Sequence, residues 1–422
     1  MPLTIQTRNT INFCSAYTLS AFGYEFILFI MTLYVYKITG EPFSVGIFTA
    51  VSLLPRLASP YYGSITDRHR RERVFGNAAG LTGLLLFAIN VYHDVRWIYF
   101  IWFFISILAM LIMNVRTAIM TEVMPKDEYL KGNSTVLIAL NLARILAPLI
   151  GGLIIGYYSE RSLLLSISVF YFLVTVFSYM IHLPFNNRKN HRTAKTTYSH
   201  IKEGLQYIFN KADLRHLLFI IIVWRFFLGF QVSLFVVFVK SFLARADIEF
   251  GLFMALLGVG SILGSLCGPM ISKRINSYKM IYWGLSIHFL LFSALGFINN
   301  YFLALVIVFV SYFIFYCTVV IIHSLRDKFT PVKLRGRVYG SIAAITTSFA
   351  VTSMLVGSYF AGLYGVEKVF IAGGLMATVG LFTNGILFSK IRLVKTLGSK
   401  HLLHPNEIMK IKDQESNLWK GK

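Results

Sequence analysis

The chain has 422 residues, of which 56% are hydrophobic and 14% are charged, and its mean hydropathy is +0.66. Because a soluble domain carries about 25% charged residues, this composition excludes a mainly water-facing surface. The formal net charge of +22 has two possible explanations, which are contact with nucleic acid and basic loops beside a membrane.

Apolar runs of roughly 20 residues recur along the whole chain, and each is long enough to cross a hydrocarbon core of about 30 Å. Backbone groups within lipid must be satisfied inside their own segment, so each run predicts a helix. The predicted fold class is an all-α membrane protein in contact with the lipid bilayer. Its twelve predicted transmembrane helices cover residues 13–36, 44–66, 74–92, 97–120, 134–157, 162–183, 217–239, 250–272, 279–298, 301–325, 337–362 and 367–389.

The Lys and Arg residues divide unequally between the two sides of these spans. The side that holds both chain ends carries most of the 40. The loops on the opposite side hold Lys37, Arg96, Arg161, Lys240, Arg245 and Lys368. Since short loops rich in Lys and Arg stay in the cytoplasm, we expect a multi-pass protein of the bacterial cytoplasmic (inner) membrane with both termini cytoplasmic. Nucleic acid is not expected as a partner.

An internal repeat is visible when the chain is shifted by 205 or 206 residues. FGYEFILF (22–29) then falls on LGFQVSLF (228–235), which pairs Glu25 with Gln231, and Gly46 falls on Gly251. A near-constant offset over several spans predicts two six-helix halves of like orientation.

The repeat predicts four parts of the chain. These are an N-terminal six-helix half at 1–183, a cytoplasmic linker at 184–216, a C-terminal six-helix half at 217–389 and a cytoplasmic tail at 390–422. Within the linker, HIKEGLQYIFNKADLRHLLF places apolar residues at helical spacing among charges, which predicts an amphipathic helix along the cytoplasmic face.

The loop GSITDRHRRERV (63–74) resembles the signature of the major facilitator superfamily. Gly63, Asp67, Arg68 and Arg71 match its pattern Gly-x-x-x-Asp-Arg-x-Gly-Arg-Arg/Lys, while Arg70 replaces the second glycine. The resemblance implies the major facilitator fold, in which two six-helix halves alternate access to a central site.

Other segments carry the resemblance further. ARILAPLIGG (143–152) is similar to the Gly-Pro-x-x-Gly-Gly motif of drug:proton antiporters through Pro148, Gly151 and Gly152, with Ala147 in place of the first glycine. NVRTAIMTEVMPKDEYLKGNS (114–134) and TPVKLRGRVYG (330–340) resemble the macrolide-efflux and enterobactin-exporter branch.

The resemblance also implies gating roles. Gly63, Asp67, Arg68 and Arg71 would form a cytoplasmic latch that holds the outward-facing state, with Asp67 paired to a neighbouring arginine or to the start of helix 337–362. Pro148, Gly151 and Gly152 would lie between the halves. The alternative is that the arginine-rich loop only sets the membrane topology.

Among the ionisable residues within the predicted spans, where each is costly and is a functional candidate by default, five stand out. They are Glu25, Arg56, Arg116, Arg144 and Arg225. Arginine does not deprotonate in proteins, so the excess of guanidinium groups favours a substrate that carries carboxylates. The predicted substrate-binding set is Arg116, Arg144, Arg225, Gln231, Tyr24 and Trp224. Arg116 and Arg144 can instead be structural, and a structural role is favoured for Arg56.

Glu25 is the one carboxylate predicted near the middle of a span, which makes it the candidate for proton coupling. A static ion pair between Glu25 and an arginine is the competing interpretation. His323 is a second candidate for proton transfer.

No enzyme signature or nucleotide-binding loop occurs in the sequence, so we predict a protein that is not an enzyme, needs no cofactor and draws energy from a proton gradient. The predicted function is secondary transport by a monomer that exports a small organic anion, such as a carboxylate-type siderophore, in exchange for protons. The alternatives are a macrolide-like or multidrug efflux pump, an importer of an anionic metabolite or siderophore, and a non-transporting membrane sensor or scaffold.

Overall fold

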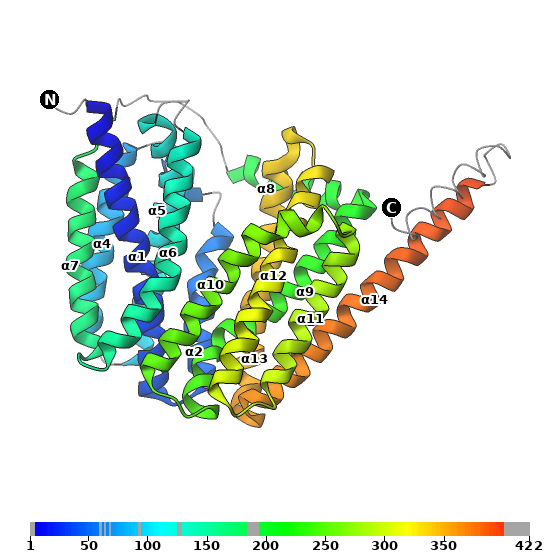
Figure 1. The fold of residues 1–422 in the computed structure, drawn as a ribbon. Helices are drawn as coiled ribbons and strands as arrows, with labels where there is room; N and C mark the ends of the chain where they lie inside the picture. The colour runs from blue at the N-terminus through cyan, green and yellow to red at the C-terminus, as the bar shows by residue number, and fades with distance from the viewer. Residues whose placement is uncertain are drawn as a thin grey trace.

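The computed structural model describes residues 5–58, 61–62, 65–66, 69–91, 94–124, 129–183 and 194–400. Across these residues the chain is almost entirely helical (Figure 1). The helices of the N-terminal half are α1 (Ile5–Thr39), α2 (Pro42–Leu53) with the 3₁₀ turn η1 (Leu54–Ala58), α4 (Arg71–Val91), α5 (Val95–Val123), α6 (Tyr129–Ile155) and α7 (Glu160–Tyr179).

The C-terminal half follows after the linker helix α8 (Ala194–Asn210). It contains α9 (Ala212–Val237), which runs on through a π-helical turn η2 (Phe238–Phe242), then α10 (Asp247–Ser272), α11 (Ser277–Leu295), α12 (Tyr301–Phe329), the short 3₁₀ turn η3 (Val332–Leu334), α13 (Arg335–Tyr364) and α14 (Val366–Lys400).

Each of the twelve predicted spans overlaps a helix in the residues that the structure describes. In the described part of the chain, ten helices are long and apolar enough to cross a membrane. The other two predicted spans correspond to the shorter apolar helix Pro42–Ala58 and to α11. The predicted all-α membrane fold is therefore confirmed. The span predicted at 44–66 differs in one detail, because Pro55 lacks a backbone N–H and the α-helix tightens to a 3₁₀ turn there.

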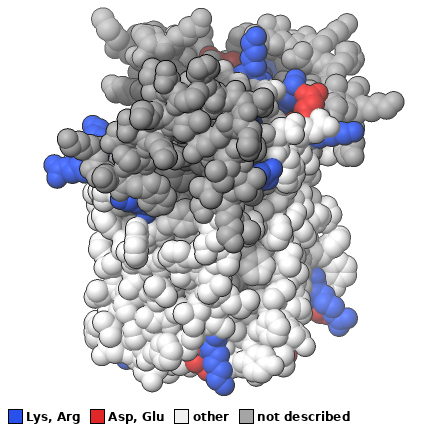
Figure 2. Space-filling view, turned by 90° about the vertical axis from the view of Figure 1, so that its right-hand side faces the viewer, with Lys and Arg blue, Asp and Glu red and all other residues white. Residues whose placement is uncertain are grey.

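The two ends of the molecule are distinct. We call the end where α1 begins and α8 lies the linker end, and the opposite end the far end (Figure 1). Figure 2 shows one face on which Lys and Arg flank a broad middle band without coloured charges. Such a band is the surface that a bilayer core requires.

The most extensive contacts between the halves are those of α2 with α13 and of α6 with α10. Both contacts depend on glycine. A Cβ atom on Gly46 would lie 1.8 Å from the Ser358 Oγ, and one on Gly251 would lie 2.4 Å from the Pro148 carbonyl oxygen. Only a residue without a side chain allows helices to approach this closely. Gly46 and Gly251, which the internal repeat pairs in sequence, therefore occupy equivalent places in the two contacts between the halves.

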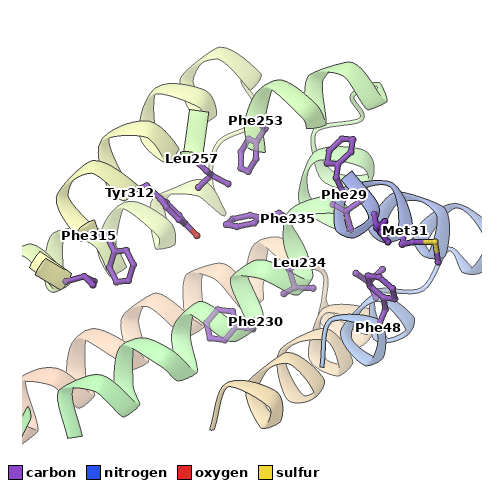
Figure 3. Close-up of a cluster of buried hydrophobic side chains, with 14 of the residues drawn as sticks. Phe29, Met31, Phe48, Phe230, Leu234, Phe235, Phe253, Leu257, Tyr312 and Phe315 are labelled. Atoms are coloured by element: carbon purple, nitrogen blue, oxygen red, sulfur yellow. The ribbon is translucent and has the colours of Figure 1, made fainter. Parts of the chain in front are cut away.

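Large apolar side chains pack between the halves in the far half of the molecule. Phe29 of α1 stacks on Phe250 of α10 with ring centroids 5.2 Å apart, and Phe43 of α2 meets the edge of Tyr359 of α13 at 6.0 Å. Figure 3 shows Phe29, Met31 and Phe48 of the N-terminal half facing the α9 segment that bears Leu234. This packing describes a state in which the halves are closed toward the far end.

We expect Gly251→Val to push the halves apart at the far end, because its side chain would overlap the backbone of α6. Single cysteines introduced at far-end positions should become more reactive to a membrane-impermeant maleimide in this variant. Gly362→Val is the matched control, since a Cβ there would meet no atom within 4 Å. Unchanged far-end reactivity in a folded Gly251→Val protein would show that this contact does not hold the closed state.

The linker helix α8 packs on the start of α13. Glu203 forms an ion pair with Arg337, and a Cβ on Gly204 would lie 2.5 Å from the Arg337 carbonyl oxygen. The helical segment predicted around 200–219 is divided at Lys211, whose extended backbone separates α8 from α9. Residues 212–216, assigned from the sequence to the linker, belong to α9, because LRHLLF continues its apolar run.

Candidate functional site

Glu25 and Arg144 form an ion pair between α1 and α6. The Arg144 Nε donates to the Glu25 Oε1 at 3.3 Å, and the side chains of Arg144 and Glu25 are 57% and 20% exposed respectively. Gly151 lets α6 approach α1, since a Cβ there would lie 2.9 Å from the Phe29 ring. Each charged residue is about 15 Å or more along its helix axis from either helix end. The pair therefore lies deep in the predicted membrane region.

The APLIGG segment of α6 contacts two neighbouring helices, α1 of the same half and α10 of the other half. Gly151 meets α1 as described, while a Cβ on Gly152 would lie 2.9 Å from the Asp247 carbonyl oxygen and 3.1 Å from the Gly251 Cα. Pro148 presents its carbonyl to α10. These three residues lie where the halves meet, as the resemblance implied, and their gating role stays a prediction.

Arg116 of α5 is held by Tyr17 of α1. Its Nη1 donates to the tyrosine hydroxyl at 3.2 Å, and the guanidinium carbon lies 5.1 Å from the ring centroid. Its Nε is buried without a hydrogen-bond partner in the described chain. Tyr24, by contrast, stacks on Trp102 at 6.2 Å and packs within the N-terminal half.

Arg225 and Trp224 occupy the corresponding region of the C-terminal half. The guanidinium carbon of Arg225 lies 4.6 Å from the Trp224 ring centroid, and the indole packs edge-on against Phe315. Arg225 interacts electrostatically with Tyr316 and His323 of α12. The Arg225 Nε, the Trp224 Nε1 and the His323 Nδ1 are all buried and make no hydrogen bond to any described residue.

Gln231 is completely buried on α9. Its Oε1 accepts a hydrogen bond from the Tyr312 hydroxyl at 3.3 Å, whereas its Nε2 has no partner among the described residues. The amide therefore keeps donor capacity for a further group. The sequence had not singled out Tyr312 or Tyr316, because a tyrosine in a membrane helix looks the same whether it packs or binds.

Arg56 lies near charged groups of both halves, where it attracts Glu25 and repels Arg225. It is exposed on η1, whereas Glu25 belongs to α1 and Arg225 to α9. No carboxylate lies within ion-pair distance of Arg56, Arg116 or Arg225 in the part of the chain that the structure describes. The region therefore brings together four guanidinium groups and one carboxylate, from both halves of the protein.

The loop motif is only partly described. Gly63, Asp67 and Arg68 lie outside the described residues. Arg71 forms an ion pair with Glu122 at 2.6 Å and also donates to the Ala118 carbonyl, so it ties α4 to α5 within the N-terminal half. At the start of α13, Arg335 donates to the Asp327 carbonyl oxygen. The predicted latch stays a prediction.

The arrangement suits the binding of an anion. Guanidinium groups taken out of water need carboxylate or other acceptor partners, and the buried Nε, indole N–H and amide donors here are unused by the described chain. Guanidinium is also the group that recognises carboxylates through paired hydrogen bonds. The described residues bring no three His, Cys, Asp or Glu side chains together in a cluster that could hold a metal ion.

Comparison with known proteins agrees with this architecture. The chain is 25% identical over 397 residues to the uncharacterized MFS-type transporter YfiS of Bacillus subtilis (strain 168), covering 90% of this chain and 94% of that protein. It is 22% identical over 358 residues to the multi-drug resistance efflux pump PmrA homolog of Lactococcus lactis subsp. lactis (strain IL1403), covering 83% and 86%.

Solved structures show the same fold. The nucleoside transporter NupG superimposes with a TM-score of 0.73 at 13% identity, covering 92% of this chain and 99% of that one. The POT family transporter PepTSo gives 0.72 at 12% identity, covering 93% and 99%. The sequence model described as "Major Facilitator Superfamily" matches residues 13–350, which is most of the chain. This protein is a multi-pass membrane transporter that belongs to the Major Facilitator Superfamily.

Proposed function

We propose that this transporter exports a small organic anion in exchange for protons. The observation that carries the proposal is the charge of the central region, where Arg56, Arg116 and Arg225 have no carboxylate partner among the described residues and Arg144 pairs with Glu25. A substrate with carboxylates would supply the missing partners. A site for lipophilic cations would require the opposite balance of charge.

A carboxylate-type siderophore fits this region best. Several carboxylates on one molecule can engage Arg116 of one half and Arg225 of the other, with Gln231 and Trp224 as further donors. The export direction is supported by the efflux pump homolog of Lactococcus lactis and by the resemblance to the macrolide-efflux and enterobactin-exporter branch.

Alternating access supplies the mechanism in this proposal. The halves rock about the central site, and the substrate binds between guanidinium groups that both halves contribute. Glu25 takes up a proton when its pair with Arg144 opens and releases it when the pair re-forms. We place the protein as a monomer in the bacterial cytoplasmic membrane, with the linker end cytoplasmic and no cofactor.

A macrolide-like or multidrug efflux pump is the second candidate. It is favoured by the similarity to the multi-drug resistance efflux pump homolog of Lactococcus lactis and by the aromatic side chains of Tyr17, Trp224 and Phe315 near the arginines. This candidate requires that uncharged or cationic compounds bind despite the four arginines.

The test of the proposed function compares a deletion strain with the same strain carrying the wild-type gene. Mass spectrometry of cells and medium should show an anionic compound that accumulates in the deletion strain and leaves the cells when the gene is restored. Restoration by a gene encoding Arg161→Gln, which changes an exposed arginine of the far end, is the control. Loss of a cationic or neutral compound from the medium would instead support the second candidate, and depletion of an anion from the cells would support import.

A further inference from the structure

A lipid-facing groove runs along the C-terminal half between α9, α13 and α14. It consists of two adjoining cavities of about 410 Å³ and 570 Å³. Ile222 and Phe349 line both cavities and mark their junction. Each volume lies in the range of about 300–1,000 Å³ that is typical of ligand sites. The groove is separate from the central site.

The groove matches the height of a membrane. Its lining on α13 extends from Ile345 to Tyr364, which is about 28 Å along the helix axis and compares with a hydrocarbon core of about 30 Å. Gly380 leaves space within it. At Gly380 an added Cβ would have the Val223 side chain as its nearest neighbour, at 3.9 Å.

The mouth at the linker end carries a cation. Arg215 lines the smaller cavity and is exposed, and its Nη1 donates to the Phe209 carbonyl at 3.1 Å, where α8 meets α9. Asn384 and the mostly buried His216 line the same cavity, and the Asn384 Nδ2 is hydrogen-bonded to the His216 Nδ1 at 3.1 Å. A basic and polar mouth above an apolar groove is complementary to a ligand with an anionic headgroup and an apolar tail.

The groove and the central site use different faces of α9. Ile222, Phe226 and Phe230 recur at every fourth residue and line the groove, whereas Trp224 and Arg225 project from the other side of the helix. A ligand in the groove would therefore pack on α9 without touching the substrate residues.

We propose that this groove binds one anionic phospholipid from the leaflet at the linker end. Its phosphate lies at Arg215, and an acyl chain runs past Ile222 and Phe349 toward Gly380. The distance from Arg215 to Phe226 along α9 is about 16 Å, close to half the hydrocarbon thickness, so one chain of one leaflet reaches the junction of the cavities. The proposal does not depend on the identity of the transported substrate.

Native mass spectrometry of the full-length protein, taken from nanodiscs of phosphatidylglycerol or phosphatidylcholine, tests the proposal. The wild type should retain one phosphatidylglycerol and less phosphatidylcholine. Arg215→Gln should lower the preference for phosphatidylglycerol about fivefold, the effect of one cation near a membrane surface. Arg274→Gln, which removes an exposed arginine from the same end outside the groove, should leave it unchanged.

A filling variant tests the apolar part. Gly380→Leu should abolish retention of the lipid, and Gly362→Leu, which adds the same side chain to α13 where no atom lies within 4 Å, should not. If Gly380→Leu does not fold, Ile222→Trp replaces it as the filling variant, because Ile222 lies at the junction of the cavities. Retention of phosphatidylglycerol by a folded filling variant at the wild-type level would overturn the site. Equal retention of both lipids by the wild type would overturn the assignment of Arg215.

Discussion

Changing Arg225 to Gln should weaken the binding of an anionic substrate by about 10- to 150-fold, and Arg116→Gln should have an effect of similar size. The expected loss is about 1.5–3 kcal/mol for one hydrogen bond to a charged group. Both guanidinium groups contact an aromatic ring, and neither forms an ion pair within the described chain. A carboxylate of the substrate would be the missing partner for each.

Equilibrium binding of a carboxylate-type siderophore to the purified protein measures this effect. Arg225→Lys should restore the affinity only in part, because an ammonium group cannot form the paired hydrogen bonds of guanidinium. The exposed far-end variant Arg161→Gln should bind like the wild type. Wild-type affinity in both Gln variants would contradict a role of these arginines in binding the substrate.

Changing Glu25 to Gln should remove uphill transport while leaving substrate exchange across the membrane. In the structure Glu25 pairs with Arg144 at 3.3 Å and also interacts with Arg56. An amide can still accept a hydrogen bond from a guanidinium group but cannot carry a proton. The coupling would therefore be lost, and the binding region would be kept.

Two assays on reconstituted vesicles separate coupling from exchange. Accumulation driven by an imposed pH gradient should fall to background in Glu25→Gln, while counterflow of labelled substrate should persist. If the pair with Arg144 is only structural, Glu25→Gln and Arg144→Gln should each lower the thermal stability and reduce counterflow together. Accumulation at the wild-type level in Glu25→Gln would remove Glu25 from the coupling mechanism and leave His323 as the next candidate.

The sequence predicted much of the fold because its signals were local or repeated. The apolar runs indicated the helices, and the pairing of Gly46 with Gly251 indicated two halves whose contacts the structure relates in space. Where the structure differs from the prediction in detail, a local feature of the sequence explains the difference. Pro55 tightened a helix to a 3₁₀ turn, and the apolar run after Lys211 extended α9 into the expected linker.

The site was harder to predict, because it depends on distances between helices. The sequence marked the five ionisable residues but left open whether Glu25 meets Arg144 or Arg56, and the structure places it within ion-pair distance of Arg144. It grouped Tyr24 with the substrate residues; that ring stacks on Trp102, and its role in substrate binding stays a prediction. The groove at Gly380 could not be predicted from the sequence, because predicting it requires knowing which side chains of other helices lie near this glycine.

The central claim is that arginines of both halves bind an anion, and one titration tests it most directly. Purified wild-type protein is titrated with a carboxylate-type siderophore, with the same molecule after its carboxylates are converted to amides, and with a lipophilic cationic drug. We predict that the carboxylate form binds at least tenfold more tightly than the amide form and that the cation does not compete. Equal binding of the carboxylate and amide forms, or tighter binding of the cation, would contradict the account.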